Sequence, residues 1–208
     1  MSRLGVGALL LLSGLAAPPG AAGQLPGIQI GLQIGYSRAG FSGEPTLSES
    51  REGSLFGVFF DRRIAGPAGV QLEFLLAKKG GGLSSAIGGT PVGIGVQLVY
   101  VEIPLLARVT IPTGGALRPS LFGGGAFALN IGCDFQTEIP GQVLQQRCDE
   151  AGGVSLSSTD VSAIAGGGIV WRTGGSEARL ELRRGIGLED VTPGVRNRVW
   201  ALLFGITF

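Results

Sequence analysis

The sequence predicts an all-β protein, an eight-stranded antiparallel up-and-down barrel whose strands cross a membrane. Three observations favour this fold class. Apolar side chains recur at every second position in segment after segment, and a period of two is typical of β-strands. The connections between these segments alternate between short and long. Charged residues make up only 15% of the chain and hydrophobic residues 44%, whereas a water-soluble domain carries about 25% charged residues.

The N-terminal segment is predicted to be an export signal. Arg3 precedes an apolar run over residues 4–17, and the small residues of Ala21-Ala22-Gly23 fit a cleavage site. The run is too short and too interrupted for a membrane-spanning helix, and no later apolar run is long enough either. We therefore expect residues 1–23 to be a cleaved signal peptide and residues 24–208 to form one barrel domain.

Eight segments of the remaining chain have the pattern of strands. Most of them approach the roughly ten residues that a tilted strand needs to cross a bilayer. They are expected at residues 28–38, 53–64, 69–79, 95–110, 117–132, 159–172, 177–188 and 198–208.

The alternation places one apolar face on each strand. In the first strand, this face carries four aliphatic side chains and Tyr36, with glutamines and glycines between them. The third and seventh strands oppose apolar to charged positions in the same way: Val70, Leu72, Phe74 and Leu76 against Gln71 and Glu73, and Leu180, Leu182 and Ile186 against Arg179, Glu181 and Arg183.

Two residues fit their strands poorly. Pro104 lies inside the fourth strand, where a proline removes a ladder hydrogen bond and a closed barrel has no edge to accommodate it; we expect a bulge there. Arg184 follows Arg183, so one of the two must face lipid, at a cost of about 2–4 kcal/mol near the midplane. A bulge beside Gly185, or a position close to the interface, would remove this cost.

The connections differ by length in a regular order. The short ones, at 65–69, 113–116 and 173–176, contain the glycine and proline of tight turns. In an antiparallel meander, strict alternation puts every short turn at one end of the barrel and every long loop at the other, as in outer-membrane barrels. The long loops are expected at about 39–52, 80–94, 133–158 and 189–197.

The direction of the polar face separates a membrane barrel from a soluble one, since a soluble barrel is apolar inside and a membrane barrel is the reverse. Alternation alone does not decide between them. Aromatic residues at strand ends on the apolar faces favour the membrane, because they would form an interfacial girdle: Tyr36, Trp171, Trp200 and Phe208. The opposite faces would then line the interior with charges: Glu73, Glu102, Arg118, Arg179, Glu181 and Arg183.

Two stretches resemble known outer-membrane proteins. The alternating end of the chain (Trp200, Leu202, Phe204, Ile206 and Phe208) resembles the terminal strand that the outer-membrane assembly machinery recognises in bacterial barrels. The stretches "YVEIPLLARV" (100–109) and "RPSLFGGGAFAL" (118–129) resemble the PorT-type outer-membrane β-barrel family. This resemblance implies an eight-stranded barrel in a Gram-negative-type outer membrane, and little about chemistry.

Enzymatic chemistry is not expected. The chain contains no histidine, which removes the commonest general base and metal ligand, and we predict no catalytic, cofactor or metal site. The glycine runs "FGGGAF" and "AGGGIVW" lack the following helix of a phosphate loop, so we expect them to relieve crowding between strands. A net charge of +1 without a basic block argues against nucleic acid as a partner.

The interior of eight strands is just filled by side chains, so we expect its charges to plug the barrel as ion pairs; a proton or ion path is the alternative.

Cys133 and Cys148 bracket part of the longest loop, and in an exported protein they are expected to form a disulfide. Closing this loop of about 15 residues would contribute roughly 3 kcal/mol. The bridge would rigidify an outer loop that also carries acidic residues.

Three functions remain open from the sequence. The first is a non-enzymatic structural or surface-interaction protein of the bacterial outer membrane that acts through its extracellular loops. The second is an accessory factor in protein export, and the third is a secreted, soluble ligand-binding barrel. The expected partners are outer-membrane lipid, the barrel assembly machinery and an unidentified ligand or protein at the loops.

Overall fold

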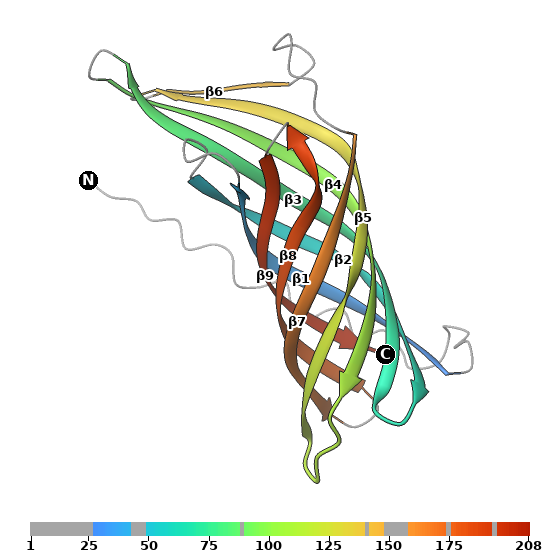
Figure 1. Ribbon diagram of the computed structural model, residues 1–208. Helices are drawn as coiled ribbons and strands as arrows, with labels where there is room; N and C mark the ends of the chain where they lie inside the picture. Colours follow the sequence, from blue (N-terminus) through green and yellow to red (C-terminus); the bar gives the residue numbers. More distant parts are fainter. Residues whose placement is uncertain are drawn as a thin grey trace, which may run out of the picture.

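The barrel is closed, as the sequence predicts. The computed structural model describes residues 27–42, 49–87, 90–139, 142–147, 158–173, 176–192 and 195–208; the predicted signal peptide lies outside them. Neighbouring strands are antiparallel throughout, and β1–β9 and β4–β5 pairings close the wall (Figure 1). The strands are β1 (Ile28–Ser42), β2 (Glu49–Ala65), β3 (Ala68–Ile87), β4 (Thr90–Thr110), β5 (Leu117–Ile139), β6 (Gln142–Arg147), β7 (Thr159–Thr173), β8 (Ser176–Thr192) and β9 (Val195–Thr207).

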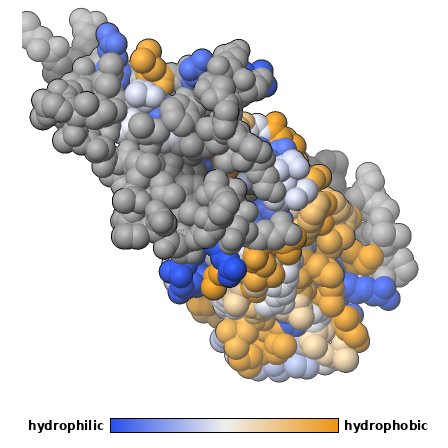
Figure 2. Space-filling view, turned by 45° about the horizontal axis from the view of Figure 1, so that its top comes forward, coloured by the Kyte–Doolittle hydropathy of each residue, from blue (hydrophilic) through white to orange (hydrophobic). Residues whose placement is uncertain are grey.

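Apolar side chains point outward and most ionised side chains of the central wall point inward. On β9, Leu202, Phe204 and Ile206 are 47%, 42% and 37% exposed, while Leu203 between them is 1% exposed. On β8, Arg179 and Glu181 are buried inside. Figure 2 shows hydrophobic residues over much of the described wall on this face, with hydrophilic residues beside their upper part. This is the orientation of a membrane barrel and the reverse of the one that a soluble barrel requires.

Part of the interior is apolar as well. A buried cluster joins residues of β2, β3, β4, β5 and β9, and Cys133 of β5 packs against it. The lumen is therefore filled by hydrophobic packing as well as by ion pairs. The cluster consists of Leu55, Leu75, Ala77, Leu98, Tyr100, Ala128, Ala201 and Leu203. No helix in the described ranges is long and apolar enough to cross a membrane.

At the end of the barrel where the long connections were expected, the strands are longer than the sequence predicts. Where long loops were expected, β1 continues to Ser42, β3 to Ile87 and β5 to Ile139. The glycine- and serine-rich segment at 80–94 carries no clear alternation, yet β3 and β4 pair across it from Gly80↔Gln97 to Ile87↔Thr90. Once a hairpin is aligned by the barrel below it, each further pair adds hydrogen bonds at little extra closure entropy.

An additional strand that the sequence does not predict extends this region. β5 pairs with β7 only as far as Leu129↔Thr159, and beyond that point it pairs with β6 from Asp134↔Arg147 to Ile139↔Gln142. In Figure 1, β3, β4, β5 and β6 project together beyond the rest of the barrel. The loop expected at 133–158 is thus largely replaced, within the described residues, by a hairpin.

The bulge expected at Pro104 is not present. The β3–β4 ladder lacks the pairs of Pro104 and Ile103, but it resumes at Leu75↔Glu102 in the same register that it has at Leu72↔Leu105. The proline is fully buried and keeps its place opposite Ala126 in the β4–β5 ladder. The missing N–H is therefore accommodated by a local gap in one ladder. The shift between β4 and β5 lies instead between Val99 and Tyr100.

The bulge beside Gly185 is not present either. The pairs Arg183↔Ala201, Arg184↔Trp200 and Gly185↔Val199 run in one register, and the shift comes only after Ile186. Arg184 is exposed on the outer face, with its guanidinium carbon 5.1 Å from the centroid of the Trp200 ring. The side chain is therefore placed by stacking on an aromatic residue, without a change in the strand.

Candidate functional site

Ionised side chains from four strands meet inside the barrel. Five of the six are at most 5% exposed, and the sixth, Asp61, is half-buried. We refer to these residues as the interior charge network: Asp61 on β2, Glu73 on β3, Arg108 on β4, and Arg179, Glu181 and Arg183 on β8.

Arg183 connects the two most buried carboxylates of the network. Its Nη1 and Nη2 donate to the two oxygens of Glu73 at 2.6 and 2.7 Å. Its Nη2 and Nε also donate to Glu181 Oε2 at 2.6 and 3.2 Å. Two parallel bonds between a guanidinium and a carboxylate are among the strongest hydrogen-bonded pairs in proteins. Arg183 therefore ties β8 to β3 across the lumen.

Arg108 and Arg179 complete the network. Arg108 Nη2 donates to Glu181 Oε1 at 2.6 Å, and Arg179 Nη1 lies 3.6 Å from Asp61 Oδ2. Gln71 Oε1 accepts from Arg108 Nε at 2.9 Å and from Arg179 Nη1 at 2.5 Å. Three guanidinium groups thus face three carboxylates, and the network is formally neutral. Neutrality matters here because an uncompensated buried charge is costly.

Neutral side chains supply the remaining donors. Gln33 Nε2 donates to Glu73 Oε2 at 2.8 Å, and Gln71 Nε2 donates to Glu73 Oε1. Arg108 Nη1 donates to Ser120 Oγ at 3.3 Å. The carboxylate of Glu73 is therefore held by three different side chains, which fixes its position in the lumen.

Two phenylalanine rings contact the guanidinium groups of the network. The guanidinium carbon of Arg179 lies 3.5 Å from the centroid of Phe59, and Phe122 lies against both Arg108 and Arg183, at 4.9 and 5.2 Å. Such contacts are cation–π interactions. The rings occupy space that glycines leave free, because a Cβ on Gly31 would lie 2.1 Å from Phe59 Cζ and one on Gly166 2.5 Å from Phe122 Cζ. At Gly166, the prediction that the glycine run relieves crowding is confirmed.

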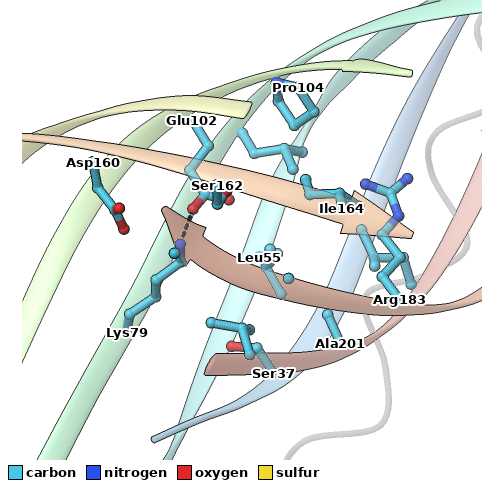
Figure 3. Close-up of a pocket in the computed structure, with 15 residues that line it drawn as sticks. Ser37, Leu55, Lys79, Glu102, Pro104, Asp160, Ser162, Ile164, Arg183 and Ala201 are labelled. Carbon is cyan, nitrogen blue, oxygen red and sulfur yellow. Dashed lines mark ion pairs between the residues drawn. The ribbon is translucent and has the colours of Figure 1, made fainter. Parts of the chain in front are cut away.

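A small cavity lies on one side of the network. It has a volume of ≈ 40 Å³ and a mostly apolar lining that includes Leu55, Leu75 and Leu203. The ion pair of Lys79 with Glu102 and the guanidinium of Arg183 border it (Figure 3). Its polar border comes from Lys79, Glu102 and Arg183, so the cavity joins the apolar cluster to the interior charge network.

A larger, polar cavity lies on the other side, toward the short turn at Gly66 and Pro67. Its volume is ≈ 590 Å³, and Asp61, Arg108 and Arg179 form the boundary that it shares with the network. The interior charge network therefore lies between a larger polar cavity and a smaller, mostly apolar one.

All six predicted interior charges lie on the inward face of the barrel. Five of them are buried. Arg118 is only partly buried, in the wall of the larger cavity, and its Nε has no hydrogen-bond partner among the described residues. Sequence reasoning missed Arg108 and Asp61. Arg108 shares the parity of Glu102 on the same strand, so extending that alternation by six residues would have identified it.

The four predicted girdle residues lie on the outer face. Tyr36, Trp200 and Phe208 are 48%, 48% and 57% exposed; Trp171 is half-buried, with its ring 6.0 Å from that of Phe204. The five residues of the predicted assembly signal all face outward on β9 or at its end. Their roles in the membrane and in assembly stay predictions.

Cys133 lies on β5, where the strand rises above the barrel, and is disulfide-bonded. Its expected partner, Cys148, lies outside the described residues, as do the acidic residues at 149 and 150. The pairing of Cys133 with Cys148 stays a prediction.

Comparison with protein families gives one match that covers most of the chain. Residues 22–192 match the family described as outer membrane protein beta-barrel domain. A comparison with curated proteins finds no match.

Solved structures of outer-membrane proteins match the chain at low sequence identity. The outer membrane protein OprG from Pseudomonas aeruginosa is 12% identical with a TM-score of 0.51, over 88% of this chain and 96% of that one. Neisserial surface protein A is 15% identical with a TM-score of 0.45, over 86% and 97%. Ail of Yersinia pestis is 12% identical with a TM-score of 0.44, over 87% and 99%. The likeness to OprG agrees with the fold described above. The family match and the apolar outer wall locate the chain in the bacterial outer membrane.

Proposed function

The chain belongs to the family of outer membrane protein beta-barrel domains, and from this premise we propose that it is a non-enzymatic, non-conducting barrel that acts at the cell surface. The acting part is the sheet that β3–β6 form beyond the barrel wall. We call this part the extracellular sheet: residues 80–87 of β3, 90–99 of β4, 130–139 of β5 and all of β6.

The observation that carries the proposal is the change of partner along β5. Up to Leu129 the strand belongs to the wall, and from Asp134 it pairs with β6 instead. The ten residues after Leu129 span roughly 33 Å at about 3.3 Å per residue. A strand that only crossed the membrane would not need this length. The extra sheet presents backbone edges and side chains to the outside, as surfaces that bind a partner by strand addition do.

The interior supports the non-conducting part of the proposal. Glu73, Glu181 and Arg183 are at most 5% exposed, and Arg183 binds Glu73 across the lumen and Glu181 on its own strand. An ion would have to displace these pairs to pass. The non-enzymatic part is supported by the absence of histidine from the whole sequence, since lipid-modifying or proteolytic sites commonly use one as general base.

The resemblance of residues 100–109 to PorT-type barrels supports a relationship to that family. The alternative function is therefore an accessory role in protein export. No contact of the described residues favours this role over action at the surface. The two functions differ in what a deletion would impair: cell-surface interaction in one case, and the amount of secreted protein in the other.

The test compares a strain lacking the protein with strains that carry either the full chain or a chain without residues 134–147. This deletion removes β6 and its partner segment of β5 but leaves the wall strands intact. We expect the shortened chain to shift on heating in gels, as a folded barrel does, and to fail to restore adhesion to glycan-coated and abiotic surfaces. Full restoration by the shortened chain would contradict the proposal. Loss of protein secretion in the deletion strain would support the export role instead.

Planar-bilayer recording tests the closed interior separately. We expect the full chain to give no channel steps in 1 M KCl. Steps of the size given by open porins would contradict a plugged lumen.

A further inference from the structure

Arginines gather on the outer face of the barrel at the end away from the short turns. Arg184 on β8, Arg198 on β9 and Arg38 on β1 are all exposed and point away from the lumen. They surround Trp200: this residue pairs directly with Arg184 on one side and with Arg38 on the other, and Arg198 is two positions away on the same strand. We call these four residues the outer-rim cluster.

The described residues leave two of these arginines without a carboxylate. Arg184 stacks on Trp200 at 5.1 Å, and neither it nor Arg198 forms an ion pair within the described ranges. Arg38 donates from Nε to Ser50 Oγ at 2.6 Å. The one carboxylate opposite Arg38 in the ladder is Glu52, which hydrogen-bonds with Tyr36. The cluster therefore carries an excess of positive charge.

Directly below the cluster the wall is apolar. In the next outward-facing row, Leu202 of β9 pairs with Leu182 of β8 on one side and with Tyr36 of β1 on the other. These three side chains are 52%, 47% and 48% exposed. A molecule that covers both rows needs an apolar tail beside a negatively charged head. A lipid has this combination and a soluble anion does not.

The depth of the cluster agrees with a lipid headgroup. Ten residues separate Phe208 from Arg198, which at about 3.3 Å per residue and a tilt near 40° amounts to roughly 25 Å along the barrel axis. The lipid-facing apolar band of such barrels is also about 25 Å tall. With Phe208 at the inner edge, Arg198 lies at the outer edge and Trp200 just beneath it, where amphipathic aromatic rings prefer to be.

We propose that the outer-rim cluster binds a phosphorylated lipid of the outer leaflet. The guanidinium groups of Arg38, Arg184 and Arg198 hold its phosphate, and the acyl chains lie along Leu182 and Leu202. Planar guanidinium groups bind phosphate with two parallel hydrogen bonds. Neighbouring strands are about 4.8 Å apart, so three strands place donors within about 10 Å, the size of a lipid headgroup. This site is separate from the extracellular sheet of β3–β6.

The test measures retention of purified lipid A by the refolded chain in neutral detergent, using native mass spectrometry. The variant R184Q/R198Q removes the two arginines that form no ion pair with a carboxylate in the described ranges. The matched control, R62Q/R63Q, removes the same charge from exposed arginines of β2 at the short-turn end. We expect wild type to bind lipid A about tenfold more tightly than its dephosphorylated form, since phosphate–arginine bonds supply the difference. We expect R184Q/R198Q to lose this preference and R62Q/R63Q to keep it.

Three results would overturn the proposal. These are equal binding of lipid A and its dephosphorylated form, unchanged binding by R184Q/R198Q, and an equal loss in R62Q/R63Q. Full competition by inorganic phosphate at millimolar concentration would assign the cluster to a free anion and also overturn it. Heating in gels checks that each variant is folded, and if the double variant does not fold, R198Q alone is compared with R62Q.

Discussion

Removing the charge of Arg183 tests the interior charge network most directly. The variant Arg183→Met keeps a long side chain against Phe122 and removes four hydrogen bonds, two to Glu73 and two to Glu181. Glu181 keeps Arg108 as a partner, but Glu73 is left with only the amides of Gln33 and Gln71. Loss of one partner from a buried ion pair costs about 3–5 kcal/mol, and we expect a destabilisation of this size.

The measurement is urea unfolding of the barrel in phospholipid vesicles, followed by tryptophan fluorescence and by the heat shift in gels. The double variant Glu73→Gln with Arg183→Met removes the stranded charge, so we expect it to regain at least about 1 kcal/mol relative to Arg183→Met alone. The control Arg172→Met breaks the half-exposed pair with Glu177 and is expected to cost less than about 1 kcal/mol. If Arg183→Met unfolds within about 1 kcal/mol of wild type, or if the double variant is less stable than the single one, the reasoning about a stranded carboxylate is refuted.

Three further predictions concern other parts of the chain. Gly166→Ala would place a Cβ 2.4 Å from the backbone oxygen of Leu182 and is expected to destabilise by about 1–3 kcal/mol. Gly125→Ala, whose Cβ meets only an oxygen at 3.5 Å, should be near neutral in the same urea assay; equal effects would refute the crowding argument. Phe208→Ala, at the end of the predicted assembly signal, should lower the amount of folded barrel in membranes without changing its unfolding in urea, and a normal membrane level would count against that role. For Cys133 and Cys148, alkylation without reduction should label neither cysteine and alkylation after reduction should label both, while a labelled thiol in the unreduced chain would rule out the bridge.

The wall of the barrel could be predicted from the sequence because lipid imposes a pattern of period two. On β9, every second residue from Trp200 to Phe208 is exposed, and this regularity fixes both the strand and its orientation. Arg179, Glu181 and Arg183 follow from the same alternation on β8. The strands in contact with lipid are thus the easiest to predict from the sequence. Each of their positions has only two environments, and these differ sharply in polarity.

The sheet that we propose to be extracellular could not be predicted because it extends past the wall strands, where alternation imposed by lipid no longer applies. The segment 80–94 is rich in glycine and serine and has no apolar face to reveal a strand. Its pairing follows from the alignment of β3 and β4 below it, which is tertiary information. The partners within the network were equally hidden, because the alternation places Glu73 and Arg183 inside but says nothing of which residue each meets across the lumen.

Arg183 and Arg184 show how the fold treats charge on the two sides of one strand. The two residues are consecutive and identical in type, and alternation sends one into the lumen and the other toward lipid. Both environments have a low dielectric constant, so each guanidinium needs a compensating anion or access to water. Arg183 finds two carboxylates within the protein. Arg184 has an aromatic ring but no carboxylate among the described residues, so its compensation must come from what surrounds the barrel. At the outer edge of the apolar band, interfacial water and the phosphate of a lipid headgroup can both provide it, and the comparison of lipid A with its dephosphorylated form separates the two.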